Sequence, residues 1–141
     1  MTSKPSGALS GDRLRARPRV LIVDDDPGLA ALLGSWLSDM ADVYTATTSA
    51  QALALAGVVR PDLAVVDVVL PRMDGFDLVL ALRRQPELTD MPVIFITGSD
   101  RLDIRIRADE LKGASVQFKP IQQEALQEAI LGLLRPPPAA V

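Results

Sequence analysis

Short apolar runs rich in β-branched residues alternate with longer segments of helical periodicity along most of this chain. The first run, Val20-Leu21-Ile22-Val23, contains no polar residue, which is typical of a strand covered on both faces of a sheet. The segment after it carries apolar residues at spacings of three and four, namely Leu29, Leu32, Leu33, Trp36, Leu37 and Met40. That spacing predicts an amphipathic helix with one buried stripe. The alternation occurs five times and therefore predicts five β/α units.

These five units predict the fold class. The expected strands cover residues 20–23, 43–46, 63–66, 93–96 and 116–118, and the expected helices cover about residues 27–40, 49–59, 74–84, 102–111 and 125–134. Crossovers between parallel strands are right-handed and lie over the sheet, so helices are expected on both faces. We therefore expect a doubly wound α/β fold with a five-stranded parallel sheet. In such a fold the ligand site lies beyond the carboxyl ends of the strands.

The residue types that are missing exclude several kinds of site. The 141 residues include no cysteine and no histidine. This excludes zinc sites built on thiolate or imidazole, a Ser-His-Asp triad, a cysteine nucleophile and a phosphohistidine. Any chemistry must therefore use carboxylates, hydroxyls or amines. A chain of this length is expected to form one domain whose core needs no disulfide.

Both ends of the chain differ from its alternating body. Residues 1–18 are rich in Ser, Gly, Pro and Arg, and residues 136–141 begin with three prolines. We expect a flexible basic N-terminal tail, a folded domain over residues 19–135 and a Pro-rich C-terminal tail. Residues 1–19 carry five basic groups against one acid, so the rest of the chain is acidic within a net charge of −3. Because an acidic body does not suit a nucleic-acid surface, we expect no nucleic-acid partner.

Hydropathy bears on location. The longest uninterrupted apolar run covers residues 52–59, and the N-terminus lacks the apolar region of a signal peptide. A membrane-spanning helix needs about 20 apolar residues, so the sequence predicts no membrane span. We expect the protein to be cytoplasmic.

Acidic residues directly follow two of the expected strands. Asp24, Asp25 and Asp26 come after the first strand, and Asp67 follows the third. Asp26 is the expected N-cap of the next helix. The other like charges need a stabilising cation, and a hard ion that keeps several waters, such as Mg²⁺, suits two or three carboxylates. We expect Asp24 and Asp25 to supply this site beside Asp67, which would act as the nucleophile toward a phosphoryl group.

The fourth and fifth strands end in a hydroxyl and an amine. Thr97 follows the fourth strand, and Lys119 follows the fifth. Oxygens of a phosphoryl group attached to Asp67 need hydrogen-bond donors, and a hydroxyl and an ammonium group provide them. The strand ends thus carry the groups that phosphoryl transfer to a carboxylate requires.

Taken together, these motifs resemble the receiver domain of bacterial two-component response regulators. The motifs are Asp24-Asp25, Asp67-Val68-Val69-Leu70-Pro71-Arg72-Met73-Asp74-Gly75, Ile96-Thr97-Gly98 and Phe118-Lys119-Pro120, in this order at four strand ends. Each motif alone is common, but the set is specific. The resemblance covers about residues 19–135, as a stand-alone domain, and implies the flavodoxin-like strand order 2-1-3-4-5.

The resemblance also implies how phosphate and metal are bound. Asp67 would accept a phosphoryl group from a sensor histidine kinase or a histidine phosphotransfer protein. Asp25, Asp67 and the backbone carbonyl of Val69 would bind Mg²⁺, and Asp24 would hold the ion mainly through its bound waters. The attached phosphoryl group would be contacted by the two remaining site residues, Thr97 and Lys119.

A domain of this kind signals and is not an enzyme with a separate substrate. By resemblance it would catalyse only its own phosphorylation and dephosphorylation. Because no output domain follows the last expected helix in this sequence, the switched surface is expected to act on a downstream protein target. A homodimer is left open, and the sequence does not identify the kinase or the stimulus.

Three positions concern the switch and the lifetime of the phosphoryl group. Most receivers have an aromatic residue three positions before the lysine, where this chain has Val116. The usual readout by an aromatic rotamer is therefore not expected. In this family the residues two positions after the acceptor and after the threonine tune hydrolysis. Here they are Val69 and Ser99, neither an acid nor an amide, so we expect slow hydrolysis.

Other interpretations remain open from sequence. A pseudo-receiver scaffold would bind partners without phosphorylation, which Val116 favours and the complete set of acids, hydroxyl and lysine opposes. An aspartate-nucleophile phosphatase would use Asp24 and Asp26, but it would leave the acid at the third strand unexplained.

Several residues near the motifs are assigned to structure alone. Asp74 is the expected cap of the helix after the third strand, and Gly75 is expected to permit a turn there. Arg101, Arg105 and Arg107 in the polar fourth helix are expected to form a solvated face with acidic neighbours on the same helix.

Overall fold

A computed structural model describes residues 17–99 and 101–134. Within these residues, one parallel sheet has the strand order β2-β1-β3-β4-β5. Its strands are β1 (Arg19–Val23), β2 (Asp42–Ala46), β3 (Leu63–Asp67), β4 (Val93–Thr97) and β5 (Ala114–Phe118). The predicted fold class and strand order are confirmed. The predictions for residues 1–16 and 136–141 lie outside the described residues.

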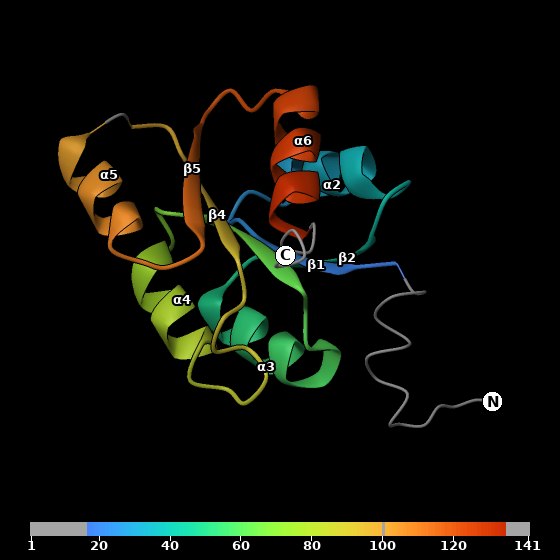
Figure 1. The fold of residues 1–141 in the computed structure, drawn as a ribbon, viewed down its shortest axis with the longest axis horizontal. Helices are drawn as coiled ribbons and strands as arrows, with labels where there is room; N and C mark the ends of the chain where they lie inside the picture. Colours follow the sequence, from blue (N-terminus) through green and yellow to red (C-terminus); the bar gives the residue numbers. More distant parts are fainter. Residues whose placement is uncertain (1–16, 100, 135–141) are drawn as a thin grey trace, which may run out of the picture.

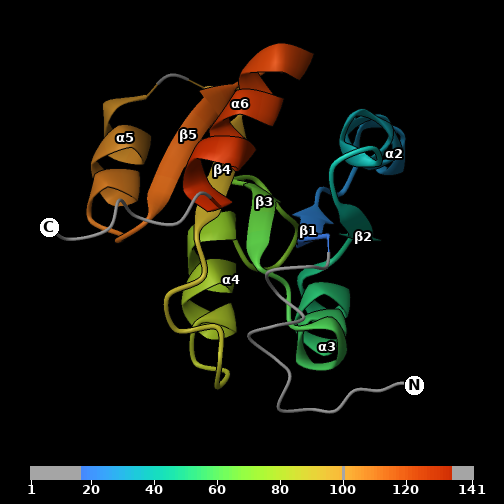
Figure 2. The same ribbon diagram turned by 45° about the vertical axis from the view of Figure 1, so that its right-hand side comes forward.

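Helices cover both faces of this sheet. They are α2 (Pro27–Leu37), α3 (Ser49–Val59), α4 (Gly75–Leu82), α5 (Leu102–Asp109) and α6 (Gln123–Leu134). The side chains of α2 and α6 pack on one face, and those of α3, α4 and α5 pack on the other (Figures 1 and 2). Every strand end that the sequence analysis singled out therefore lies at one edge of the sheet, since all strands run the same way.

Successive residues of each inner strand enter opposite cores. In β1, Leu21 and Val23 pack toward α3 and α4, whereas Val20 and Ile22 pack toward α2 and α6. The same alternation occurs in β3 and β4, where every residue is buried. A strand buried on both faces needs apolar residues at every position, which explains the unbroken apolar runs.

Side-chain caps fix where the helices begin. The Asp26 carboxylate accepts hydrogen bonds from the amides of Gly28 and Leu29 at 2.9 and 3.2 Å, and Asp74 accepts one from the Asp77 amide at 2.9 Å. Both predicted caps are confirmed. Each cap satisfies amides that have no partner within the helix, so α2 and α4 start directly beyond the acidic strand ends.

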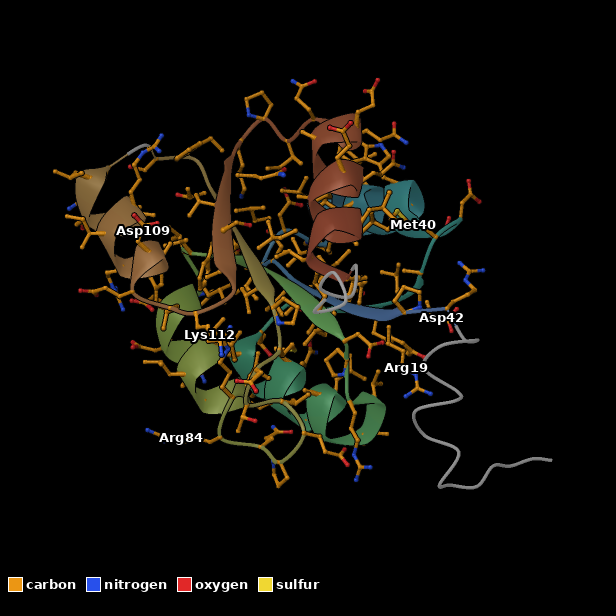
Figure 3. All side chains as sticks on the ribbon, viewed as in Figure 1. Arg19, Met40, Asp42, Arg84, Asp109 and Lys112 are labelled. Atoms are coloured by element: carbon orange, nitrogen blue, oxygen red, sulfur yellow. The ribbon has the colours of Figure 1, made fainter. Side chains whose placement is uncertain are left out.

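The predicted stripe of α2 is wrong at one position. Leu32 is 46% exposed, and the residues of α2 that the sheet buries are Ala30, Leu33 and Leu37. The buried face of α2 is therefore narrower than the apolar pattern predicted. Charged side chains such as Arg19, Asp42, Arg84, Asp109 and Lys112 lie at the periphery (Figure 3). In the described part of the chain, no helix has the length and apolar character to cross a membrane.

Two glycines offer a matched test of backbone crowding. A Cβ atom on Gly75 would lie 2.3 Å from the carbonyl oxygen of Asp67, whereas one on Gly132 in α6 would meet no atom within 4 Å. We expect Gly75→Ala to lower the free energy of unfolding by about 1–3 kcal/mol, because β3 or α4 must shift to make room for the added Cβ atom. Gly132→Ala should raise it by about 0.5–1 kcal/mol, because alanine favours the helix. Urea denaturation checks both, and an unchanged midpoint for Gly75→Ala would contradict the close packing.

Candidate functional site

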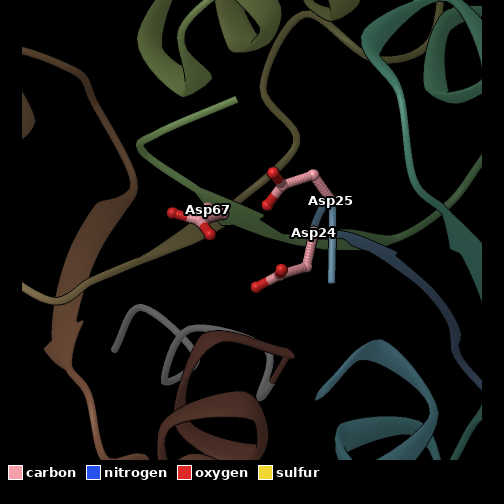
Figure 4. A group of neighbouring side chains, drawn as sticks. All are labelled: Asp24, Asp25 and Asp67. Carbon is pink, nitrogen blue, oxygen red and sulfur yellow. The ribbon is translucent and has the colours of Figure 1, made fainter. Parts of the chain in front are cut away.

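Three carboxylates meet at the carboxyl edge of the sheet. Asp24 and Asp25 directly follow β1, and Asp67 ends β3, which pairs with β1. One carboxylate oxygen of each residue lies within 4.8 Å of the others, and the three side chains project into one space (Figure 4). The predicted acid cluster therefore forms, because two neighbouring strands end at the same level of the sheet.

Asp24 is the most deeply placed of the three acids. Its side chain is fully buried, and its Oδ1 accepts a hydrogen bond from the Asp26 amide at 2.8 Å. Its Oδ2 is buried and has no hydrogen-bond partner among the described residues. Burial raises the pKa of Asp24, the Asp26 amide opposes this, and the charge of Asp67 raises the pKa further. The fold therefore holds an incompletely neutralised carboxylate in its interior.

Asp67 is held from two sides. Its Oδ1 accepts a hydrogen bond from the Val69 amide at 2.9 Å, and its Oδ2 accepts one from the Lys119 ammonium at 3.0 Å. The residue is 4% exposed, whereas Asp25 beside it is exposed. These two contacts fix the carboxylate at the carboxyl edge of the sheet, where almost all of its surface is covered.

Lys119 bridges the two buried acids. Its Nζ lies 3.0 Å from Asp67 Oδ2 and 3.5 Å from Asp24 Oδ2, and its side chain is about one-third exposed. Burial lowers the pKa of Lys119, but the hydrogen bond and charge of Asp67 and the charge of Asp24 outweigh it, so the pKa is raised. The lysine therefore remains an ammonium group and compensates one of the two negative charges.

The remaining predicted residues lie nearby with different contacts. Thr97 ends β4 and is fully buried, and its Oγ1 accepts a hydrogen bond from the Ser99 amide at 3.1 Å. β4 adjoins β3, with Ile96 opposite Asp67, so Thr97 stands one residue beyond Asp67 in register. Val69 donates its amide to Asp67, and its side chain is 69% exposed. Val69 therefore contacts Asp67 through its backbone amide, and its apolar side chain is exposed.

The donor set suits a hard divalent cation. All three clustered side chains offer carboxylate oxygens, the ligands that Mg²⁺ prefers, and the buried Oδ2 of Asp24 has no hydrogen-bond donor among the described residues. With three carboxylates and one ammonium group, the site carries excess negative charge. A cation with bound waters would supply both missing charge and missing hydrogen bonds.

The loop after β3 closes on the acceptor. The Gly75 amide donates to the Val68 carbonyl at 2.8 Å, so residues 69–74 leave and return beside Asp67. The assignment of Gly75 to a turn is wrong, since it is the first residue of α4 and is needed for the space beside the Asp67 carbonyl. The left-handed residue of this loop is Arg72, with φ of 70°. Sequence reasoning could not separate these two roles.

Arg101, Arg105 and Arg107 are exposed, as predicted for a solvated face, and Arg101 pairs with Asp103 at 3.1 Å, but Arg107 has other partners than expected. Arg107 pairs with Asp74 and Asp77 of the neighbouring segment at 3.3 and 3.9 Å, so the prediction that its acidic partners lie on its own helix is wrong. Its guanidinium also lies over the Phe76 ring, with the Cζ atom 4.2 Å from the ring centroid. Arg105 similarly lies over Phe118 at 4.7 Å. No sequence signal identified these contacts, because their partners lie on other elements.

Comparison with known proteins agrees with this geometry. Residues 20–131 match the family model described as the response regulator receiver domain. The chain belongs to this family. Its receiver domain is 34% identical over 120 residues to the DNA-binding dual master transcriptional regulator RpaA of Synechocystis, and 37% identical over 120 residues to the transcriptional regulatory protein PrrA of Mycobacterium leprae. Both alignments cover 84% of this chain, which spans about half the length of these relatives (49% and 50%).

Solved structures show the same fold. The receiver domain superimposes on chemotaxis protein CheY4 of Vibrio cholerae with a TM-score of 0.79 at 28% identity, covering 84% of this chain and 99% of that one. It also superimposes on the receiver domain of a histidine kinase from Syntrophus aciditrophicus, with a TM-score of 0.73 and 28% identity over 88% of this chain and 98% of that one. The recognition of a two-component receiver from its strand-end motifs is thus confirmed.

The buried charge of Asp24 predicts a stability effect. Because its pKa is raised, the ionised form is disfavoured in the folded state, so Asp24→Asn should raise the melting temperature at neutral pH without Mg²⁺ by a few degrees. The asparagine can still accept from the Asp26 amide. The gain should shrink as the pH falls through the raised pKa, where Asp24 itself takes up a proton. Calorimetry of exposed Asp39→Asn is the control, and a lower melting temperature for Asp24→Asn would contradict the argument.

Proposed function

We propose that this receiver domain accepts a phosphoryl group on Asp67 in a Mg²⁺-dependent reaction, from a sensor histidine kinase or a histidine phosphotransfer protein. The observation that carries the proposal is the setting of Asp67. Its carboxylate lies at the rim of the site, between the Val69 amide at 2.9 Å and the Lys119 ammonium at 3.0 Å, and two further acids stand beside it. These groups hold a nucleophile in place and supply charge for the group that it receives.

The transfer needs no reactant other than the phosphorylated imidazole of the donor and a proton from solvent. One carboxylate oxygen of Asp67 attacks phosphorus, and a new O–P bond forms as the P–N bond to the donor imidazole breaks. The electron pair of that bond goes to the imidazole nitrogen, which takes up a proton from solvent. Lys119 pairs with the transferred oxygens, and the Thr97 hydroxyl, which donates to the Ser99 carbonyl at 3.4 Å, turns to donate to them. In this way both groups stabilise the product.

Magnesium would be held by Asp25, Asp67 and the Val69 carbonyl, with Asp24 binding mainly through the ion's waters. When bound, the ion would supply positive charge against the carboxylates and the phosphoryl oxygens. The Oδ2 of Asp24 supports this arrangement, because it has an ion pair with Lys119 at 3.5 Å but no hydrogen bond, and a metal-bound water can donate one.

The names of similar proteins are relevant to the partners that we propose for this domain. One relative of this chain, 31% identical over 121 residues, is the sensor histidine kinase TmoS, of which the alignment covers 12%. This supports a histidine kinase or phosphotransfer protein upstream, and a protein target downstream. The absence of a nucleic-acid partner stays a prediction, because a relative that this chain only half spans is named as DNA-binding. A homodimer also stays open.

The proposal predicts a specific mass change. Incubation with acetyl phosphate and Mg²⁺ should add one phosphoryl group, detected by intact mass spectrometry. Asp67→Asn should add none, because it lacks the nucleophilic oxygen. Asp25→Ala and a sample with chelator should be labelled far more slowly, because the metal charge is missing.

Asp39→Ala is the matched control, since it removes an exposed acid away from the cluster and should be labelled like the wild type. An adduct that persists in Asp67→Asn would place the acceptor elsewhere. If the wild type takes up no phosphoryl group from acetyl phosphate, the pseudo-receiver scaffold becomes the better account of this site.

The aspartyl phosphate should be long-lived. Neither Val69 nor Ser99 has a carboxylate or amide side chain to orient a water molecule for attack on phosphorus, so we expect a half-life of minutes or longer. Val69→Glu, which places a carboxylate two residues after the acceptor, should shorten it about ten-fold or more. Mass spectra taken after removal of acetyl phosphate measure the decay.

Val58→Glu makes the same change at a site 83% exposed near the far end of α3, and it should decay like the wild type. A half-life of seconds in the wild type would contradict the argument from Val69 and Ser99.

A further inference from the structure

Helix α5 is attached to its neighbours by two arginine–aromatic contacts. The Arg105 guanidinium lies over the Phe118 ring of β5, and the Arg107 guanidinium lies over the Phe76 ring of α4. The helix buries only Ile104 and Ala108 and has no side-chain N-cap, so its hydrophobic anchorage is small. The two guanidinium groups therefore add to this small apolar anchorage of α5, together with the ion pairs of Arg107 to Asp74 and Asp77.

The first ring, that of Phe118, belongs to a residue that directly adjoins the site around Asp67. Phe118 precedes Lys119, whose ammonium contacts Asp67, and it lies opposite Thr97 in the β4–β5 register. The Lys119 amide donates to the Thr97 carbonyl at 2.8 Å. A shift of Lys119 or Thr97 is therefore transmitted to the ring on which Arg105 lies.

The second ring is attached to the other side of the site. Phe76 follows Gly75, which packs against the carbonyl of Asp67, and it stacks on Phe95 of β4 with ring centroids 4.5 Å apart. Arg107 also contacts Asp74, the cap of α4, at 3.3 Å. This arginine thus joins α5 to the end of the loop that surrounds the acceptor.

The three rings account for every phenylalanine of the chain. Phe76, Phe95 and Phe118 stand around the acceptor end of the sheet, whereas Val116, opposite Phe95, is half-buried and aliphatic. The three phenylalanines thus belong to β4, β5 and α4, and two of them are contacted by arginines of α5.

We propose that Arg105 and Arg107 are positioning residues that link the phosphorylation state of Asp67 to the position of α5. The inference rests on the proposed function. A phosphoryl group on Asp67 brings new negative charge to the site, so Lys119 leaves its present carboxylate contact to pair with it. Phe118 follows Lys119, its contact with Arg105 weakens, and α5 is released from the observed position. The contacts belong to the unphosphorylated form and therefore oppose phosphorylation by linkage.

The test is a titration with beryllium fluoride and Mg²⁺, a non-covalent mimic of the phosphoryl group on a carboxylate, followed by calorimetry. Arg105→Gln and Arg107→Gln should each bind the mimic about two- to five-fold more tightly than the wild type. Arg101→Gln is the matched control, since Arg101 pairs with Asp103 of the same helix at 3.1 Å, and its affinity should not change.

A second variant separates the contact from a general loosening of the helix. Phe118→Leu keeps an apolar side chain but removes the ring face, so it should match Arg105→Gln, and the double variant should gain no more than either single change. Hydrogen exchange of residues 102–109 should accelerate in the wild type when the mimic binds. In Arg105→Gln combined with Arg107→Gln it should already be fast and should respond little.

The outcomes are distinct. Equal or weaker binding in the arginine variants, with the wild type binding normally, overturns the role of the two arginines and leaves the acceptor function standing. Additive effects of Arg105→Gln and Phe118→Leu also overturn it. If the wild type does not bind the mimic, the proposed function fails and this inference fails with it.

Discussion

The contact of Lys119 with two buried carboxylates is the interaction on which the site depends. Its ammonium lies 3.0 Å from Asp67 and 3.5 Å from Asp24, and it compensates only one of their two charges. Loss of the Lys119 charge would leave both buried carboxylates without a compensating cation, which is strongly unfavourable. Because this compensation is incomplete, the site keeps excess negative charge, which under the proposed function would attract a cation beside the Asp67 carboxylate.

The sheet makes this arrangement possible. The acids come from β1 and β3 and the lysine follows β5, so three separate β/α units must pack correctly before the charges meet. The inner strands β3 and β4 are buried throughout, which fixes the height at which each strand ends. The loops at that edge carry the reactive groups, whereas the buried strands hold them in register.

Sequence reasoning succeeded where short-range patterns decide the structure. Apolar runs predicted the strands. The polar residues directly after these runs were predicted to meet at one edge of the sheet, namely Asp24, Asp67, Thr97 and Lys119. It failed for features that depend on what a residue meets in space. Gly75 was expected to make a turn but provides room beside a carbonyl, and the acidic partners of Arg107 lie outside its own helix. Residues that contact one another in this way are far apart along the chain, so a local sequence pattern cannot predict the contact.

The small free energy of the two arginine–aromatic contacts limits how far they alone can shift the position of α5. An exposed cation–π contact contributes about 0.5–1 kcal/mol, so two of them couple the acceptor to α5 by about 1–2 kcal/mol, or about 5- to 30-fold. A complete switch between two states needs a preference of about 10⁴. Phosphorylation would therefore shift the population of α5 positions by a limited amount. A partner that binds only the released position would supply the rest, which ties a full response to the presence of the downstream protein.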